Sequence, residues 1–268
     1  MQTVPGAYDA ERARLEAMPL ADRDAAWLRE RVLLDVAHRQ RPREVLEQLR
    51  TLRSELDPPA YAAVQAEVDA LLAGETVTIH GYNPRLDDLE VDQWQRLAEV
   101  GDELGRRGYT WFVTSGTLLG IVRHGGFVPT DDDLDIAVLL DATDDASAAK
   151  AWLTARSDLA DLLRVQDHER GAELDLEGPT IDLFPAWIAA DDRLHVWPWC
   201  RGEVPGSALL PLEHVAVGGV TVPVAADPAA LLAVNYGPDW QIPDPLFGFD
   251  WPRAHQRFAG WKAGLPSG

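Results

Sequence analysis

The sequence predicts an α+β protein in which an all-helical N-terminal part precedes a part that mixes helices with strands. Two patterns lead to this prediction. Between residues 8 and 73, apolar residues recur every three or four positions, which is the spacing of one helix face. After residue 108, short runs of β-branched and aromatic residues typical of strands alternate with helical patterns. We therefore expect a helical appendage over residues 1–75 and a second domain over residues 76–268.

Composition limits the function further. With 268 residues, 46% of them hydrophobic, the chain can bury a sizeable core. A formal charge of −20 argues against nonspecific nucleic-acid binding, which needs a basic surface. Cys200 is the only cysteine, so neither an intrachain disulfide nor a cysteine-based zinc site can form. Residues 1–20 lack a signal-peptide pattern and no apolar run is long enough for a membrane span, so we expect a cytoplasmic protein.

The N-terminal part is expected to form about three helices. Pro42 and Pro58 suit helix starts, and Gly74 suits a helix end. Trp27 fits a core position better than an interface anchor. We expect these helices to pack on the following domain or on a second copy of the chain, which would make a homo-oligomer. The apolar stripes that predict the three helices are Leu28, Val32 and Val36; Val45, Leu49, Leu52 and Leu56; and Tyr61, Val64, Val68 and Leu71.

The second part begins with a predicted linker over residues 76–87, where Gly81, Asn83 and Pro84 interrupt the pattern. Aromatic residues in the tail 236–268 indicate that this segment wraps the domain. Between them the sequence predicts helices at 89–107, 116–124, 143–157 and 227–235, strands at 109–113, 133–140, 162–166, 173–176 and 180–184, and several short strands within 187–224.

The acidic segment Asp131-Asp132-Asp133-Leu134-Asp135 runs directly into an apolar strand. Side chains at positions i and i+2 of a strand share a face, so Asp133 and Asp135 are expected to point together. Buried charge is costly unless it is compensated, and two carboxylates on one face suit Mg²⁺ or Mn²⁺. A solvated acidic turn is the alternative. A calcium-binding loop is excluded because its sixth and twelfth positions hold Ile136 and Ala142.

A further carboxylate, Asp182, lies between apolar residues of a predicted strand. An acid in such a strand needs a partner, so Asp182 could complete the metal site or act as a general base for a hydroxyl nucleophile. Asp175 is a competitor, but it belongs to an alternating acidic face that is more typical of solvent exposure.

The turn at Gly116-Thr117 follows a predicted strand and opens a predicted helix, where backbone N–H groups attract phosphate. Arg123 lies near the end of the same helix and could neutralise phosphate charge, although a surface role is the alternative. His124 could be a base or a ligand, but we favour a structural role at the helix C-terminus. The chain lacks the P-loop sequence and the Gly-x-Ser-x-Gly elbow, which argues against those two enzyme classes.

Three segments in this order form a recognisable set. They are Gly116-Thr117-Leu118-Leu119-Gly120, continuing through Arg123-His124-Gly125-Gly126-Phe127, Pro129 and Asp131-Asp132-Asp133-Leu134-Asp135; then Ile181-Asp182-Leu183-Phe184-Pro185; then Tyr236-Gly237 with Trp240 and Pro243. Together they resemble the LicD family, which includes bacterial phosphocholine transferases and is related to fukutin-type ribitol-phosphate transferases. The resemblance covers roughly residues 88–245.

This resemblance implies a nucleotidyltransferase-like fold, with a short mixed sheet flanked by helices. It implies that Gly116 and Thr117 contact phosphate and that Asp131 and Tyr236 belong to the substrate or nucleotide site. Thr130 departs from the family, which commonly has Trp there, and residues 1–75 have no counterpart. The metal ligands implied by the resemblance are Asp133, Asp135 and Asp182.

The predicted function is a Mg²⁺-dependent phosphotransferase of the LicD type, with Asp133, Asp135, Asp182 and Arg123 as its catalytic residues. It would move a phospho-alcohol or sugar phosphate from a CDP- or UDP-linked donor to a hydroxyl of a glycan or small molecule. One alternative is a nucleotidyltransferase that moves NMP from an NTP to a small acceptor. An alternative of another class is a catalytically inactive binding or scaffold protein.

Overall fold

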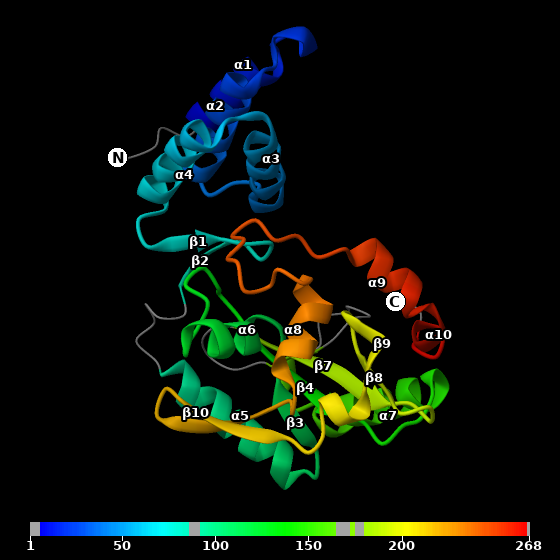
Figure 1. The fold of residues 1–268 in the computed structure, drawn as a ribbon. Helices are drawn as coiled ribbons and strands as arrows, with labels where there is room; N and C mark the ends of the chain where they lie inside the picture. The colour runs from blue at the N-terminus through cyan, green and yellow to red at the C-terminus, as the bar shows by residue number, and fades with distance from the viewer. Residues whose placement is uncertain (1–5, 86–91, 165–171, 175–179, 267–268) are drawn as a thin grey trace. The chain divides into compact units, whose positions relative to one another are not determined.

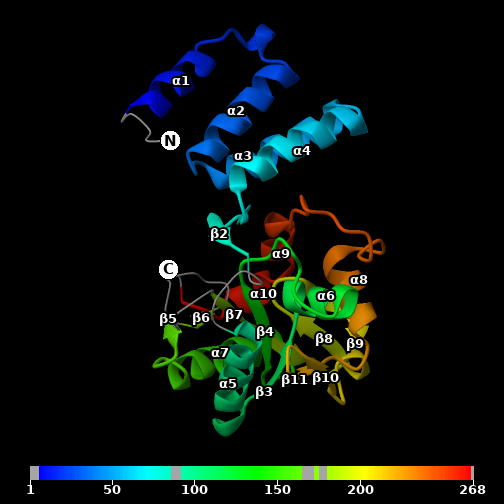
Figure 2. The same ribbon diagram turned by 90° about the vertical axis from the view of Figure 1, so that its left-hand side faces the viewer.

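The computed structural model describes residues 6–85, 92–164, 172–174 and 180–266. The chain divides into two compact units, Met1–Asp88 and Leu89–Gly268 (Figures 1 and 2). The predicted α+β class is confirmed: a helical N-terminal region precedes a mixed sheet flanked by helices. None of the described helices is both long and apolar enough to cross a membrane.

The N-terminal unit contains four α-helices among its described residues, where the sequence predicted about three. Pro42 and Pro58 begin helices as expected, and Asp24 and Asp57 cap helices by accepting backbone N–H bonds. The helices are α1 (Ala7–Glu16), α2 (Ala25–Ala37), α3 (Pro42–Glu55) and α4 (Pro58–Leu72), with a short 3-10 helix at Leu20–Asp22.

The core of this unit follows the predicted apolar stripes, except that Leu28 and Leu56 are only half-buried and one position is shifted. Leu71 is 37% exposed, and its neighbour Leu72 is buried in its place. Trp27 is a core residue, as expected, and its ring nitrogen donates to the Leu15 carbonyl over 2.8 Å. The other stripe residues that are buried are Val32, Val36, Val45, Leu49, Leu52, Tyr61, Val64 and Val68.

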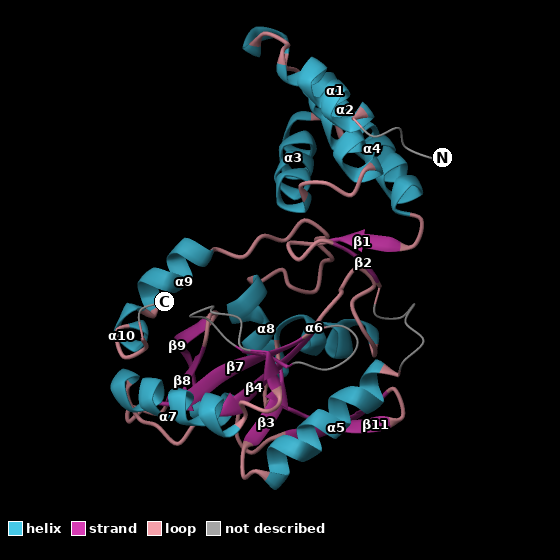
Figure 3. Ribbon diagram, turned by 180° about the vertical axis from the view of Figure 1, so that it is seen from behind, coloured by secondary structure: helices cyan, strands magenta, loops and turns pink. Residues whose placement is uncertain are grey.

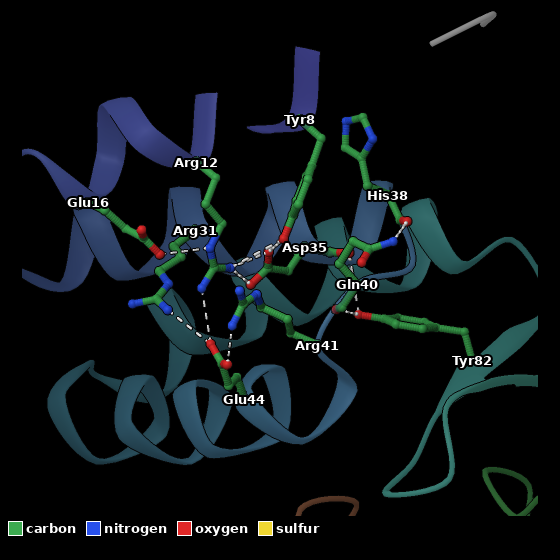
Figure 4. Close-up of polar contacts among 10 residues, drawn as sticks. All are labelled: Tyr8, Arg12, Glu16, Arg31, Asp35, His38, Gln40, Arg41, Glu44 and Tyr82. Carbon is green, nitrogen blue, oxygen red and sulfur yellow. Dashed lines mark hydrogen bonds and ion pairs between the residues drawn. The ribbon is translucent and has the colours of Figure 1, made fainter. Parts of the chain in front are cut away.

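Helix α1 has few apolar residues and is held largely by charge (Figure 4). Asp35 of α2 is fully buried and accepts from the Arg12 guanidinium and from the Tyr8 hydroxyl, the latter over 2.7 Å. Glu44 of α3 accepts from Arg12 over 3.1 Å and from Arg31 over 3.0 Å. One partly buried ion network therefore joins α1, α2 and α3, and an apolar pattern alone does not predict it.

The predicted linker is wrong in part. Strands β1 (Glu75–Val77) and β2 (Tyr82–Pro84) form an antiparallel hairpin in the N-terminal unit. The Tyr82 hydroxyl ties the hairpin to the helices by donating to the Gln40 carbonyl over 2.8 Å. The unit accordingly ends after Asp88, whereas the sequence placed the domain boundary after residue 75.

The second unit is built on a sheet of seven strands among the described residues. Its main path has the order β3-β4-β7-β6-β5, while β8 also pairs with β7, and β9 pairs with β8. The strands are β3 (Thr110–Val113), β4 (Leu134–Leu139), β5 (Leu163–Arg164), β6 (Ala172–Leu174), β7 (Ile181–Ile188), β8 (Arg193–Val196) and β9 (Cys200–Pro205), with a separate hairpin of β10 (Glu213–Val217) and β11 (Val220–Val224).

The helices of this unit flank the sheet. Figure 3 shows α5 and α7 on one face, and α6 lies beside α8 near the ends of β4 and β7 (Figure 1). The tail forms two short helices and buries Phe258 and Trp261, consistent with a tail that wraps the domain. The helices are α5 (Gln93–Arg106), α6 (Ser115–His124), α7 (Asp145–Asp158), α8 (Pro228–Tyr236), α9 (Trp251–Arg257) and α10 (Ala259–Lys262).

Strands β4 and β7 are parallel neighbours, and their other sheet pairings are antiparallel. Strand β7 continues beyond Phe184, where the sequence prediction ended it. Pro185 is tolerated because it falls between Leu183, the last residue paired with β6, and Ala186, the first paired with β8. This register places Asp135 of β4 directly opposite Asp182 of β7.

Candidate active site

Three carboxylates lie together where the parallel strands β4 and β7 begin. Asp133 immediately precedes β4, and Asp135 and Asp182 are register partners on β4 and β7. One carboxylate oxygen from each lies within 4.8 Å of the others. Oxygens that share a Mg²⁺ at about 2.1 Å are at most about 4.2 Å apart. The three side chains therefore fit one such ion after a small rotation.

A second carboxylate group overlaps the first. Asp131, Asp132 and Asp133 also offer oxygens within 4.8 Å of one another. Asp132 is only 8% exposed, whereas Asp131 and Asp133 are half-buried, so the segment is only partly open to solvent. The structure thus brings together the three predicted metal ligands and the predicted substrate residue Asp131.

Helix α6 holds Asp135 in position. The Gly116 amide donates to the Asp135 carboxylate over 2.7 Å, and the Thr117 hydroxyl accepts from the Asp135 amide over 2.8 Å. The Thr114 amide donates to the Asp135 carbonyl over 3.1 Å. Asp135 is therefore bound through its side chain and through both of its backbone polar groups.

Gly116 sits where no side chain fits. A Cβ built at this position would clash with an Asp131 carboxylate oxygen and lie 3.0 Å from an Asp135 oxygen. The absence of a side chain lets α6 approach the acidic cluster closely. The predictions that Gly116 and Thr117 contact phosphate stay predictions, because the groups described for them here bind Asp135.

The acids raise one another's pKa. Burial raises the pKa of Asp135 well above its usual range, and the charges of Asp133 and Asp182 add to this, while the backbone amides of Gly116 and Thr117 oppose it. Burial also raises the pKa of Asp131, assisted by Asp133 and Asp135. Like charges crowded in a partly dry site favour either a proton or a cation. A divalent cation would stabilise all of the carboxylates in their charged form.

Helix α8 packs against α6 and ends at Tyr236. Burial and then the charges of Asp135, Asp131 and Asp133 raise the pKa of Tyr236, which keeps its hydroxyl protonated. Asn235, the preceding residue, donates to the Ser115 hydroxyl over 3.4 Å. Tyr236 thus lies within the electrostatic reach of the acids, where the resemblance predicted a substrate residue.

Arg123 lies in the last turn of α6, the helix that packs beside α8. Burial lowers the pKa of its guanidinium, and Tyr236 opposes that shift. Its Nε donates to His124 Nε2 over 3.0 Å, and its Nη1 donates to the Trp240 carbonyl over 3.3 Å. Among the residues that the structure describes, no carboxylate pairs with Arg123. The structural role expected of His124 stays a prediction.

Residues 108–227 match the family model described as LicD/FKTN/FKRP, nucleotidyltransferase domain. This match confirms the resemblance to the LicD family. The LicD-type segment contains α6, β4 and β7, and with them the three carboxylates and Arg123, whereas Tyr236 lies beyond its end.

Two other comparisons give shorter or weaker similarities. Over 46 residues the chain is 41% identical to uncharacterized protein RP689 of Rickettsia prowazekii (strain Madrid E) and to uncharacterized protein RT0683 of Rickettsia typhi (strain ATCC VR-144 / Wilmington). These segments cover 17% of this chain, and 17% and 15% of those proteins. The solution structure of antibiotic-resistance factor ANT(2'')-Ia is similar over 66% of this chain and 86% of its own, with 15% identity and a TM-score of 0.38.

Sequence reasoning missed three residues around this site. Thr114 and Ser115 connect β3 to α6, and Ser115 adopts a left-handed backbone angle (φ 41°) that its sequence does not signal. Asn235 reaches Ser115 across 120 positions, so only the fold brings them together. Asp175, the weighed competitor of Asp182, lies outside the described residues.

Proposed function

We propose that the protein is a metal-dependent phosphotransferase. It would transfer a phospho-alcohol or sugar phosphate from a CDP- or UDP-linked donor to a hydroxyl of a glycan or small molecule. The observation that carries this proposal is the group formed by Asp133, Asp135 and Asp182 inside a LicD-type domain. Three carboxylates converging at parallel strand ends form an oxygen donor set suited to Mg²⁺ or Mn²⁺.

Asp133, Asp135 and Asp182 would hold the ion, which when bound would offset the negative charge of the donor phosphates. The partly buried Arg123, which has no described carboxylate partner, would donate to the transferring phosphate. Tyr236 would serve as a neutral hydrogen-bond donor beside it.

The reaction balances without a further reactant. The acceptor oxygen forms a bond to the transferred phosphorus as the bond to the nucleotide phosphate breaks, and the nucleoside monophosphate leaves. The acceptor proton passes to a carboxylate. Asp182 is our choice for this base: one of its carboxylate oxygens would bind the ion with Asp133 and Asp135, and the other would take the proton.

The test is Mg²⁺-dependent release of CMP or UMP from CDP- and UDP-linked donors in the presence of candidate acceptors. We expect the single variants Asp133→Ala and Asp135→Ala each to abolish measurable turnover. Asp161→Ala is the matched control, because this exposed aspartate pairs with Arg107 away from the cluster. If both cluster variants kept full activity, the assignment would fail.

Nucleotidyl transfer is the second candidate, because the matching family model is described as a nucleotidyltransferase domain. The same carboxylates would then serve an NTP donor, and pyrophosphate would leave in place of a nucleoside monophosphate. Pyrophosphate release from ATP or CTP with candidate acceptors separates the two reactions. If the protein bound neither Mn²⁺ nor nucleotide, both would be excluded in favour of a scaffold.

A further inference from the structure

At the start of α6, fewer hydrogen-bonding groups are available to a phosphate than the sequence predicts. Gly116 and Thr117 occupy the strand-to-helix turn where backbone N–H groups commonly bind phosphate. In this chain the Gly116 amide already donates to the Asp135 carboxylate over 2.7 Å. Thr117 is only 1% exposed, and its hydroxyl accepts from the Asp135 amide over 2.8 Å. Both residues are therefore directed at Asp135.

The strand pairing explains why Asp135 needs Thr117. The β3–β4 ladder ends at the pair Val113–Ile136, and Asp135 is the residue just before Ile136 in β4. Its carbonyl still accepts from the Thr114 amide, but the Thr114 carbonyl is taken by the Leu118 amide in the first turn of α6. A buried amide without a partner is costly. The Thr117 hydroxyl takes the place of the missing strand carbonyl.

Gly116 holds the side chain of Asp135, whereas Thr117 holds its backbone amide. Its amide binds the Asp135 carboxylate, and its missing side chain leaves the space that the Asp131 and Asp135 carboxylates occupy. The two neighbouring residues thus fix the backbone and the carboxylate of Asp135 separately. A carboxylate held at both points can turn only slightly, so its free oxygen keeps a defined direction.

We propose that Gly116 and Thr117 are positioning residues that orient Asp135 as a metal ligand, rather than phosphate contacts. This inference rests on the metal site of the proposed function. The groups that orient a metal ligand typically change metal affinity about 10- to 100-fold when they are removed. A phosphate contact would instead change the affinity for the donor.

The test is a calorimetric titration of the full chain with MnCl₂ alone, without nucleotide. Thr117→Val removes the hydroxyl at nearly constant shape and should weaken Mn²⁺ binding about 10- to 100-fold. Thr117→Ser keeps the hydroxyl and should restore binding to within about threefold of the wild type. Thr154→Val is the control, because this exposed threonine lies on α7 and should leave Mn²⁺ affinity unchanged.

The same variants separate the two roles kinetically. At saturating Mn²⁺, positioning predicts that Thr117→Val leaves the donor KM within about twofold of the wild type. Wild-type Mn²⁺ affinity combined with a raised donor KM would overturn the proposal. Wild-type protein that binds no Mn²⁺ would overturn it as well.

A measurement on the wild type keeps the proposal testable if Thr117→Val fails to fold. The Asp135 amide should stay protected from hydrogen exchange when Mg²⁺ and pyrophosphate are added, because Thr117 keeps its bond to Asp135. Loss of that protection would show that Thr117 releases Asp135 for phosphate and would contradict the proposal.

Failure of the proposed function and failure of the positioning proposal give different results. If Thr117→Val weakens Mn²⁺ binding but the wild type turns over no donor, the positioning role is supported and phosphotransfer is excluded. Donor turnover by the wild type, with unchanged Mn²⁺ affinity in Thr117→Val, supports phosphotransfer and removes positioning.

Discussion

At the scale of single residues, the site combines crowded carboxylates with the guanidinium of Arg123. Asp135 and Asp131 have raised pKa values because they are buried beside other acids. Arg123 lies near Tyr236 and binds only neutral groups within the described part of the chain. In a chain with a net charge of −20, a partly buried arginine that pairs with none of the described acids is a natural contact for an anionic substrate.

We predict that Arg123→Ala lowers kcat/KM for the phosphate donor by about 10²–10³, because a charged donor to the reacting phosphate is lost. Arg123→Lys should recover only part of this, since it keeps the charge without the planar fork. Steady-state kinetics measures both. Arg253→Ala, an exposed arginine on α9, serves as the control and should retain wild-type kinetics. Equal losses in Arg123→Ala and Arg253→Ala would contradict a specific role.

The buried thiol of Cys200 predicts that the free energy of unfolding depends on pH. Burial raises the pKa of its thiol from 9.0 to about 11, so folding favours the protonated form. The resulting stability is complete below pH 9 and is lost as the pH rises toward 11. Between pH 8 and 10.5 the wild type should lose about 2 kcal/mol of unfolding free energy that Cys200→Ala does not lose. Urea unfolding at both pH values measures this, and parallel losses in the two proteins would refute it.

At the scale of elements, the central segment is the part that sequence reasoning predicts best. Strand β3, helix α6 and strand β4 each have a strong local pattern, and Asp133 and Asp135 share a face because strands alternate. Local pattern cannot show that β7 lies parallel to β4, and that pairing is what places Asp182 opposite Asp135. The roles of these residues as ligands stay predictions.

The features that sequence reasoning left out or placed incorrectly depend on distant contacts: the fourth N-terminal helix, the β1–β2 hairpin and the end of β7. Helix α1 has a weak apolar pattern and relies on a buried charge pair between Arg12 and Asp35. Strands β1 and β2 are only three residues long and pair around Gly81, so their pattern resembles a linker. Strand β7 extends past Pro185 because its pairing with β6 stops before this residue and its pairing with β8 begins after it. A residue without an N–H is tolerated in that gap.

The ion network of the N-terminal unit predicts a large stability difference between two ion pairs. Asp35→Ala should cost about 3–5 kcal/mol, because it leaves the nearly buried Arg12 without its main partner. Glu30→Ala is the matched control, since it breaks the exposed pair with Arg14 and should cost less than about 1 kcal/mol. Urea unfolding followed by circular dichroism measures both. Similar costs for the two variants would contradict the network's role.

At the scale of the whole molecule, each unit has its own core, so we expect two unfolding transitions in calorimetry. Asp35→Ala should lower only one of them. MnCl₂ at about 100 times its Kd should raise the other by about 5–10 °C, because the ion binds only the folded site. KCl at matched ionic strength controls for general screening of the net charge. A single transition, or a Mn²⁺ effect that persists in Asp135→Asn, would contradict this prediction.

The most direct test of the metal site is anomalous diffraction from crystals grown with MnCl₂. The site predicts a manganese peak within about 2.0–2.4 Å of carboxylate oxygens from Asp133, Asp135 and Asp182. The same data from Asp135→Asn crystals should show a much weaker peak or none. A wild-type crystal with no peak at these carboxylates, at a Mn²⁺ concentration that saturates binding in solution, would contradict the account.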